Sequence, residues 1–158
     1  MGRMMGIRGL RRWCCILFAC VFCACEEDMV HRFCAVDSQD WQKSYKARFH
    51  LTDMKLRGQY DLSVEARIAK QYLYKDLWLE VETKKNGEVQ ALDTVCLDVV
   101  ARSGEMDGSG RNILGYKKPV RSIAVAPTDT LDICVRHILT VTPVPGVHDV
   151  GILLVPQR

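Results

Sequence analysis

The chain has 158 residues, of which 48% are hydrophobic and 26% are charged, and its formal net charge is +3. This composition excludes a collagenous, low-complexity or wholly disordered chain. A polytopic membrane protein is also excluded, because the sequence has no stretch of 18 apolar residues. Four arginines and no acidic residue lie among the first 25 residues. Without these arginines, 18 basic residues face 19 acidic ones, and a net charge of −1 gives no electrostatic case for nucleic-acid binding.

The N-terminal segment has the organisation of an export signal. Arg3 to Arg12 form a positive region, and Trp13–Phe22 is an apolar run of ten residues, too short to span a bilayer stably. A small residue then precedes a cysteine, Ala24-Cys25, as in a bacterial lipobox. We therefore predict a lipoprotein signal peptide over residues 1–24, with cleavage before Cys25 and acylation of its thiol. The alternative is a plain signal peptide that is cut near Ala24.

The residues that follow Cys25 are polar and acidic. Glu26-Glu27-Asp28 is either a solvated part of a tether or an export signal, because it resembles the acidic tract behind the lipidated cysteine of surface-exported lipoproteins. We predict a lipidated cysteine and tether over residues 25–40. Acyl chains would hold the protein in the outer membrane, at about 0.8 kcal/mol per buried methylene. The periplasmic and the surface face both stay open.

Beyond the tether, apolar and polar residues alternate with a period of two, which is typical of antiparallel strands with one buried face. Seven strands are predicted, within residues 45–51, 60–68, 77–82, 94–99, 120–126, 131–139 and 150–155. Between Arg102 and Lys118 the alternation stops, and four glycines indicate a long loop. Seven strands joined by turn residues predict an all-β fold, a single antiparallel β-sandwich of jelly-roll-like form over residues 41–158.

The turns make local predictions. Asn86-Gly87 predicts a tight hairpin, but a regular two-residue loop would set Glu80 opposite Asp93, where like charges repel. One extra residue or a bulge would instead pair Leu79 with Val95, and we predict this register. Two glycines near the end are also expected to be structural. Gly146 follows a proline in a turn and is predicted at positive φ, and Gly151 lies within a strand, where its missing side chain allows a close approach or a bulge.

Three stretches, in order along the chain, resemble the GldH family of gliding-motility-associated lipoproteins. They are Tyr72–Leu79, with Asp76 where the family has Asn; Asp93-Thr94 with the loop Gly104–Gly110, which has Met106 in place of Trp; and Val144–Gly151, which is similar to Leu-Pro-Gly-Ile-x-Asp-Val-Gly. The resemblance implies a cell-envelope lipoprotein of Bacteroidota that is needed for gliding in gliding relatives. Its implied partners are other envelope or gliding-machinery proteins.

No pattern of side chains points to catalysis, a metal or a cofactor. The four histidines share no ligand spacing, and no serine lies in a Gly-x-Ser-x-Gly motif. Asp107 lies near glycines but lacks the repeated acidic ligands of calcium loops. We therefore expect neither enzyme activity nor a cofactor nor a metal. A Cys96–Cys134 disulfide stays open, since it requires adjacent strands of suitable geometry.

Aromatic residues cluster at the start of one predicted strand: Tyr72, Tyr74 and Trp78. Trp78 falls on the polar side of that strand, so the cluster would form a surface for a partner protein or a glycan, or else a second small core beneath a loop. The leading hypothesis is a non-enzymatic lipoprotein of an envelope protein assembly. The alternative is a surface carbohydrate-binding module, and a glycoside hydrolase, which needs two suitably spaced carboxylates, comes third.

Overall fold

The computed structural model describes residues 29–36, 40–52 and 56–157. Their strands are β1 (Val30–Ala35), β2 (Asp40–Trp41), β3 (Ala47–His50), β4 (Gly58–Ala69), β5 (Asp76–Lys85), β6 (Glu88–Asp98), β7 (Ile113–Val125), β8 (Leu131–His137), β9 (Val144–Pro145) and β10 (Val147–Pro156). In these ranges we find no helix with the length and apolar character needed to cross a membrane. The predicted signal peptide, Cys25 and the acidic triplet lie outside the described residues.

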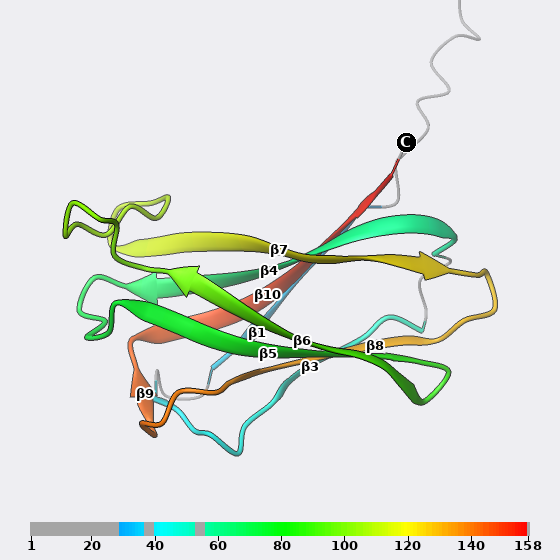
Figure 1. Cartoon of the computed structure of the whole chain (residues 1–158), viewed down its shortest axis with the longest axis horizontal. Helices are drawn as coiled ribbons and strands as arrows, with labels where there is room; N and C mark the ends of the chain where they lie inside the picture. Colours follow the sequence, from blue (N-terminus) through cyan, green and yellow to red (C-terminus); the bar gives the residue numbers. More distant parts are fainter. Residues whose placement is uncertain (1–28, 37–39, 53–55, 158) are drawn as a thin grey trace, which may run out of the picture.

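Eight of the strands form two antiparallel sheets that lie face to face (Figure 1). One sheet has the order β1-β10-β4-β7 and the other β3-β8-β5-β6, while β2 and β9 form a separate short pair. Apart from that pair, each connection passes from one sheet to the other except the β5–β6 hairpin. This strand order is that of a jelly roll. The predicted all-β, jelly-roll-like sandwich is confirmed.

The core lies between the sheets, because the strands alternate inward apolar and outward polar side chains. Along β4 the residues Leu62, Val64 and Ile68 are at most 1% exposed, and Trp41 of the short pair is fully buried beside this core. A fully buried side chain of this size contributes about 1.5–3 kcal/mol to stability through the hydrophobic effect. The period of two in the sequence therefore marks the residues that hold the sheets together.

The β5–β6 hairpin has the predicted register. Leu79 pairs with Val95, and Glu80 pairs with Thr94 instead of an acidic residue. Both leucine and valine are buried. The register that keeps Glu80 away from an acidic partner is thus also the one that keeps the apolar residues of both strands on the inner face.

The hairpin reaches this register through a bulge. Asn86 and Gly87 both have positive φ, 54° and 81°, as a two-residue hairpin turn requires. The pairing then shifts by one residue between Thr83 and Lys84, and Gln90 is the extra residue of β6. A bulge bends its strand and redirects a side chain. Gln90 is therefore placed at the inner edge of the hairpin.

The structure corrects the predicted start of the sandwich. Residues 30–35, expected within the tether over 25–40, form the edge strand β1, which pairs with β10. Val30 is 1% exposed. The prediction failed because an edge strand with one buried residue at its start lacks the alternation of a half-buried strand. The glycine-rich loop is also shorter than predicted, since β7 already begins at Ile113.

Both predicted glycine roles hold. Gly146 has φ +83°, in the left-handed region that favours glycine. A Cβ at Gly151 would lie 2.6 Å from ring atoms of Phe33, its partner on β1. The guanidinium carbon of Arg67 lies over the same ring, 4.4 Å from its centre. Gly151 therefore allows the aromatic ring to lie flat across the sheet.

The disulfide between Cys96 and Cys134 does not form. Cys96 lies on β6 and Cys134 on β8, and β5 runs between these two strands. Both cysteines are free thiols. The condition of adjacent strands is not met, so these two residues do not cross-link the sheet.

Candidate functional site

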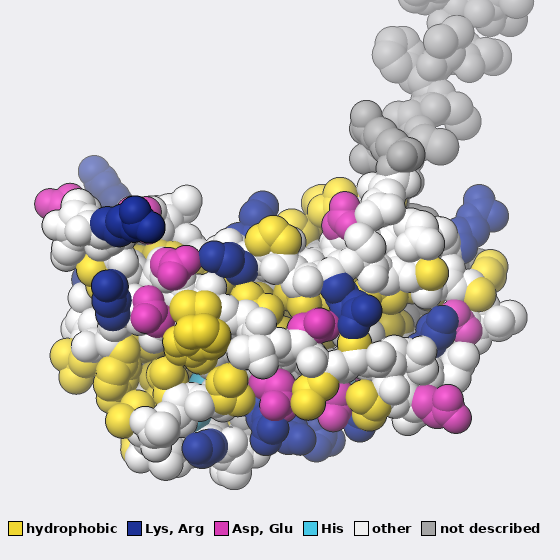
Figure 2. Space-filling view, in the orientation of Figure 1, with side chains coloured by type: hydrophobic (Ala, Val, Ile, Leu, Met, Phe, Trp, Pro, Cys, Tyr) yellow, Lys and Arg dark blue, Asp and Glu magenta, His cyan; other side chains and the backbone are white. Residues whose placement is uncertain are grey.

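The clearest exposed apolar surface lies at one end of the sandwich, where β5 begins and β8 ends. Trp78 on the outer face of β5 is 43% exposed, Leu73 in the β4–β5 connection 77%, and Val141 in the β8–β9 connection 38%. The Trp78 carbonyl accepts a hydrogen bond from the Ile138 amide, which joins the two regions. We call Leu73, Trp78 and Val141 the Trp78 patch. In Figure 2 hydrophobic side chains gather at this end of the molecule.

The three predicted aromatic residues have different surroundings. Tyr72 is buried at 7% exposure, and its hydroxyl donates to the Asp76 carbonyl at 3.1 Å. Its ring makes an edge contact with Tyr74, which is half-buried, at 5.4 Å between centroids. Burial raises the pKa of Tyr72, so it stays a neutral hydroxyl. Tyr72 is therefore part of the core instead of the predicted surface, and only Trp78 of the three is strongly exposed.

Two carboxylates and a thiol lie next to Trp78. Cys96 is the cross-strand partner of Trp78, and Asp76 is the partner of Asp98. Their ligand atoms all lie within 4.8 Å of one another. Lys118 Nζ lies 3.0 Å from Asp98 Oδ2, which offsets the repulsion between the two acids.

The Asp76, Cys96 and Asp98 side chains are the donors in the described part of the chain that could together hold a metal ion. However, metal binding requires a thiolate. Burial raises the pKa of the Cys96 thiol, and the two neighbouring carboxylates raise it further. The thiol is thus protonated at neutral pH, and Lys118 already neutralises part of the acidic charge.

The remainder of this sheet face carries paired charges. Arg136 forms a hydrogen-bonded ion pair with Glu80, and this bond lowers the pKa of the Glu80 carboxyl. Further along the face, Lys84 Nζ lies 3.2 Å from a Glu82 oxygen. Exposed ion pairs of this kind contribute at most about 1 kcal/mol each. They give the apolar patch a polar border.

Trp78 stands on an open surface. Five shallow hollows of about 10–290 Å³ in the described part of the chain are lined by residues other than Tyr72, Tyr74 and Trp78. Asp107 lines one of them, of about 290 Å³, together with Asp98 and Lys118. The aromatic side chain therefore presents a face for docking, not the wall of one of these hollows.

Sequence patterns located Trp78 but missed the exposed Leu73 and Val141 at the same end of the sandwich. Leu73 and Val141 lie in connections between strands, where apolar and polar residues do not alternate. The sequence there gives no pattern from which the exposure of an apolar residue can be predicted. Cys96 and Asp98 come close to Asp76 only through the register of the β5–β6 hairpin. The predicted register of the hairpin therefore contained the information that Cys96 lies opposite Trp78 and Asp98 opposite Asp76.

The fold and this surface define a jelly-roll β-sandwich domain that carries an exposed apolar patch on an open sheet face. The GldH lipoprotein family matches residues 28–154, which include nearly all of the sandwich. The chain belongs to the GldH lipoprotein family. It is accordingly a membrane-anchored lipoprotein of the cell envelope.

Two further comparisons add little. No curated protein matches the chain. Among solved structures, dimeric latent PorU from Porphyromonas gingivalis is similar over 81% of this chain, with 12% sequence identity and a TM-score of 0.33. The chain spans 12% of the length of that protein.

Proposed function

We propose that this protein is a non-enzymatic component of an envelope protein assembly of the gliding-motility type, and that the Trp78 patch is its contact surface. The observation that carries the proposal is the 43% exposure of Trp78 on the outer face of β5, near the β4–β5 and β8–β9 connections that carry the exposed Leu73 and Val141. Membership of the GldH lipoprotein family supports the envelope setting.

The patch has the composition of a protein interface. Tryptophan is enriched among the residues that dominate binding energy, and such residues lie in an apolar centre with a polar rim. Trp78 supplies the aromatic centre, and the Arg136–Glu80 ion pair lies one cross-strand pair further along β5. A partner that covers the indole would remove its remaining exposed area from water at about 25 cal/mol per Å².

We further propose that Cys25 carries the lipid and that the anchor lies in the outer membrane. Because β1 begins at Val30, five residue steps separate the lipidated position from the sandwich. A fully extended chain covers at most about 3.3–3.6 Å per residue, so this tether spans roughly 17 Å. The sandwich would thus stay within roughly 17 Å of the bilayer surface, within reach of other membrane-associated proteins.

The test is a crosslinking pull-down from intact envelopes with Trp78→Ala. Removal of a central tryptophan typically costs about 2 kcal/mol or more of binding, or roughly 30-fold in affinity. Val155→Ala is the matched control, because Val155 is 38% exposed on the other sheet and pairs with Asp61. We expect the same proteins to be captured by wild type and control, and to be lost with Trp78→Ala at an unchanged melting temperature. Equal capture by all three proteins would contradict the proposed surface.

A glycan-binding function is the alternative. It is favoured by one observation, the placement of the Trp78 ring on the same face as the Asp76 and Asp98 carboxylates. Aromatic rings stack on sugars, and carboxylates accept hydrogen bonds from sugar hydroxyls. Saturable binding of envelope polysaccharide by the purified protein, abolished by Trp78→Ala, would favour this alternative over a protein partner.

A further inference from the structure

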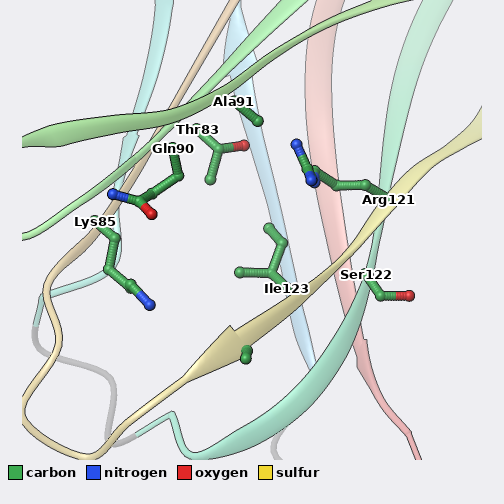
Figure 3. Close-up of a pocket in the computed structure, with 8 residues that line it drawn as sticks. Thr83, Lys85, Gln90, Ala91, Arg121, Ser122 and Ile123 are labelled. Atoms are coloured by element: carbon green, nitrogen blue, oxygen red, sulfur yellow. The ribbon is translucent and has the colours of Figure 1, made fainter.

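A polar hollow of about 180 Å³ lies on the other side of sheet β3-β8-β5-β6 from the face described above, at the edge where β6 approaches β7. It is lined by Thr83, Lys85, Gln90, Ala91, Arg121, Ser122, Ile123 and Ala124. One wall comes from the β5–β6 hairpin and the other from β7, as Figure 3 shows. The hollow is thus formed by residues of both sheets.

Three side chains at this edge depart from the pattern of the core. Thr83 and Lys85 continue the inward-facing positions of β5, and Arg121 pairs with the inward-facing Leu62 of β4. Inward positions of a sandwich are normally apolar. The Thr83 hydroxyl is buried, whereas the two cations lie where this edge opens to solvent, Lys85 with a side-chain exposure of 31% and Arg121 with 41%.

Thr83 supplies the second observation. It is 1% exposed, and its Oγ1 has no hydrogen-bond partner among the described residues. A buried hydroxyl without a partner destabilises the fold, because it has lost its hydrogen bonds to water and forms none within the protein. In Figure 3 this oxygen points toward the Arg121 guanidinium across the hollow. A ligand oxygen between the two would give both a partner.

Both cations retain donors for such a ligand. Arg121 places one guanidinium nitrogen 3.3 Å from Asp93 Oδ2, which leaves other N–H groups of its five. Lys85 Nζ lies 3.7 Å from Asp129 Oδ2, beyond hydrogen-bond length. Asp129 instead accepts hydrogen bonds from the Asn86 side chain and from the backbone amide of residue 126, and so serves the neighbouring turn.

The hairpin bulge completes the lining. Gln90 is the extra residue of β6, and the shift in pairing brings its amide group into the hollow beside Lys85 (Figure 3). Bulges are enriched beside functional sites because they redirect a side chain. The bulge that sets the hairpin register thus also adds a hydrogen-bonding group to this wall.

We propose that this hollow is a binding site for a small oxyanion ligand, a carboxylate or phosphate group on a compact polar body. Arg121 and the Thr83 hydroxyl donate to the oxyanion, and Lys85 and Gln90 contact the remainder of the ligand from the hairpin wall. The volume of about 180 Å³ is more than ten times the roughly 10–15 Å³ that one water needs, so a molecule of monosaccharide size fits.

The experiment titrates the full-length lipidated protein in non-ionic detergent micelles with glucose 6-phosphate, glucuronate and, as the neutral probe, glucose. The methyl groups of Thr83, Ala91 and Ile123 line the hollow and report binding by NMR. We expect one or both anions to shift these three signals saturably, and glucose to leave them unchanged. Tighter binding of glucose 6-phosphate would identify phosphate as the preferred group, and tighter binding of glucuronate would identify carboxylate.

Two variants and a control test the assignment. Arg121→Gln and Thr83→Val should each weaken anion binding by about tenfold or more, as expected for the loss of a hydrogen bond to a charged group. Thr83→Val should also raise the melting temperature, because it removes the unpartnered hydroxyl. Arg48→Gln changes an exposed cation on β3 and should leave binding unchanged. Methyl signals that do not respond to either anion, or an affinity that Arg121→Gln leaves intact, would overturn the proposal.

Discussion

Replacement of His137 by leucine should stabilise this protein. His137 lies on the inner face of β8, fully buried, and within the described structure neither of its ring nitrogens has a hydrogen-bond partner. Its ring packs edge-on against Trp41, with 5.3 Å between centroids, and its cross-strand partner is Leu79. The imidazole thus occupies an apolar position of the core.

The magnitude follows from two opposing effects. A buried polar group without a partner costs about 1–3 kcal/mol. The edge contact with Trp41 contributes about 0.5–1.5 kcal/mol and is lost with leucine. Because leucine is close to histidine in volume, repacking adds little. We expect His137→Leu to raise the free energy of unfolding by about 1 kcal/mol at pH 7.5.

The pH dependence gives the same reasoning a second test. Burial lowers the pKa of His137 from its ordinary 6.5 and is the largest effect on this group. The Trp41 backbone raises this pKa by a smaller amount, and the positive charge of Lys43 lowers it. Below about pH 6.5 the unfolded chain therefore binds more protons than the folded protein, and stability falls as the pH decreases. His137→Leu lacks this contribution, so its advantage over wild type should grow from pH 7.5 to pH 5.

Urea unfolding at several pH values measures both quantities. The difference between wild type and variant isolates His137, because the other titrating groups are common to both proteins. A variant that is less stable than wild type at pH 7.5, together with a difference that does not change with pH, would refute the argument. That result would mean that the imidazole has good hydrogen-bond partners in solution.

Two further predictions concern the end of the chain and its beginning. Gly146→Val should destabilise by roughly 1 kcal/mol or more and lower the melting temperature, because φ is +83° and a Cβ would lie 3.3 Å from Tyr72 Cα; an unchanged melting temperature would argue against the strained turn. Cys25→Ser should abolish incorporation of labelled palmitate and release the protein from the membrane fraction, since the thiol is the proposed site of acylation; continued labelling of the serine variant would place the lipid elsewhere.

Local sequence determined much of this protein. The period of two in β4, β5 and β8 separates inner from outer residues, because successive side chains of a strand point to opposite faces. Asn86-Gly87 fixes the hairpin turn, and the repulsion between Glu80 and Asp93 excludes one of its two registers. Each of these features depends on residues that are close in sequence or directly opposite across one turn.

Tertiary structure alone decided the remainder. β10 lies between β1 and β4, so the identity of β1 as a strand depends on a partner more than 100 residues away. Tyr72 and Trp78 have the same aromatic character in the sequence, yet one is buried and the other exposed. The polar hollow joins Thr83 of one sheet to Arg121 of the other. Alternation tells which face of a strand is apolar, but only the packing of distant strands decides which strands become neighbours and which side chains meet between them.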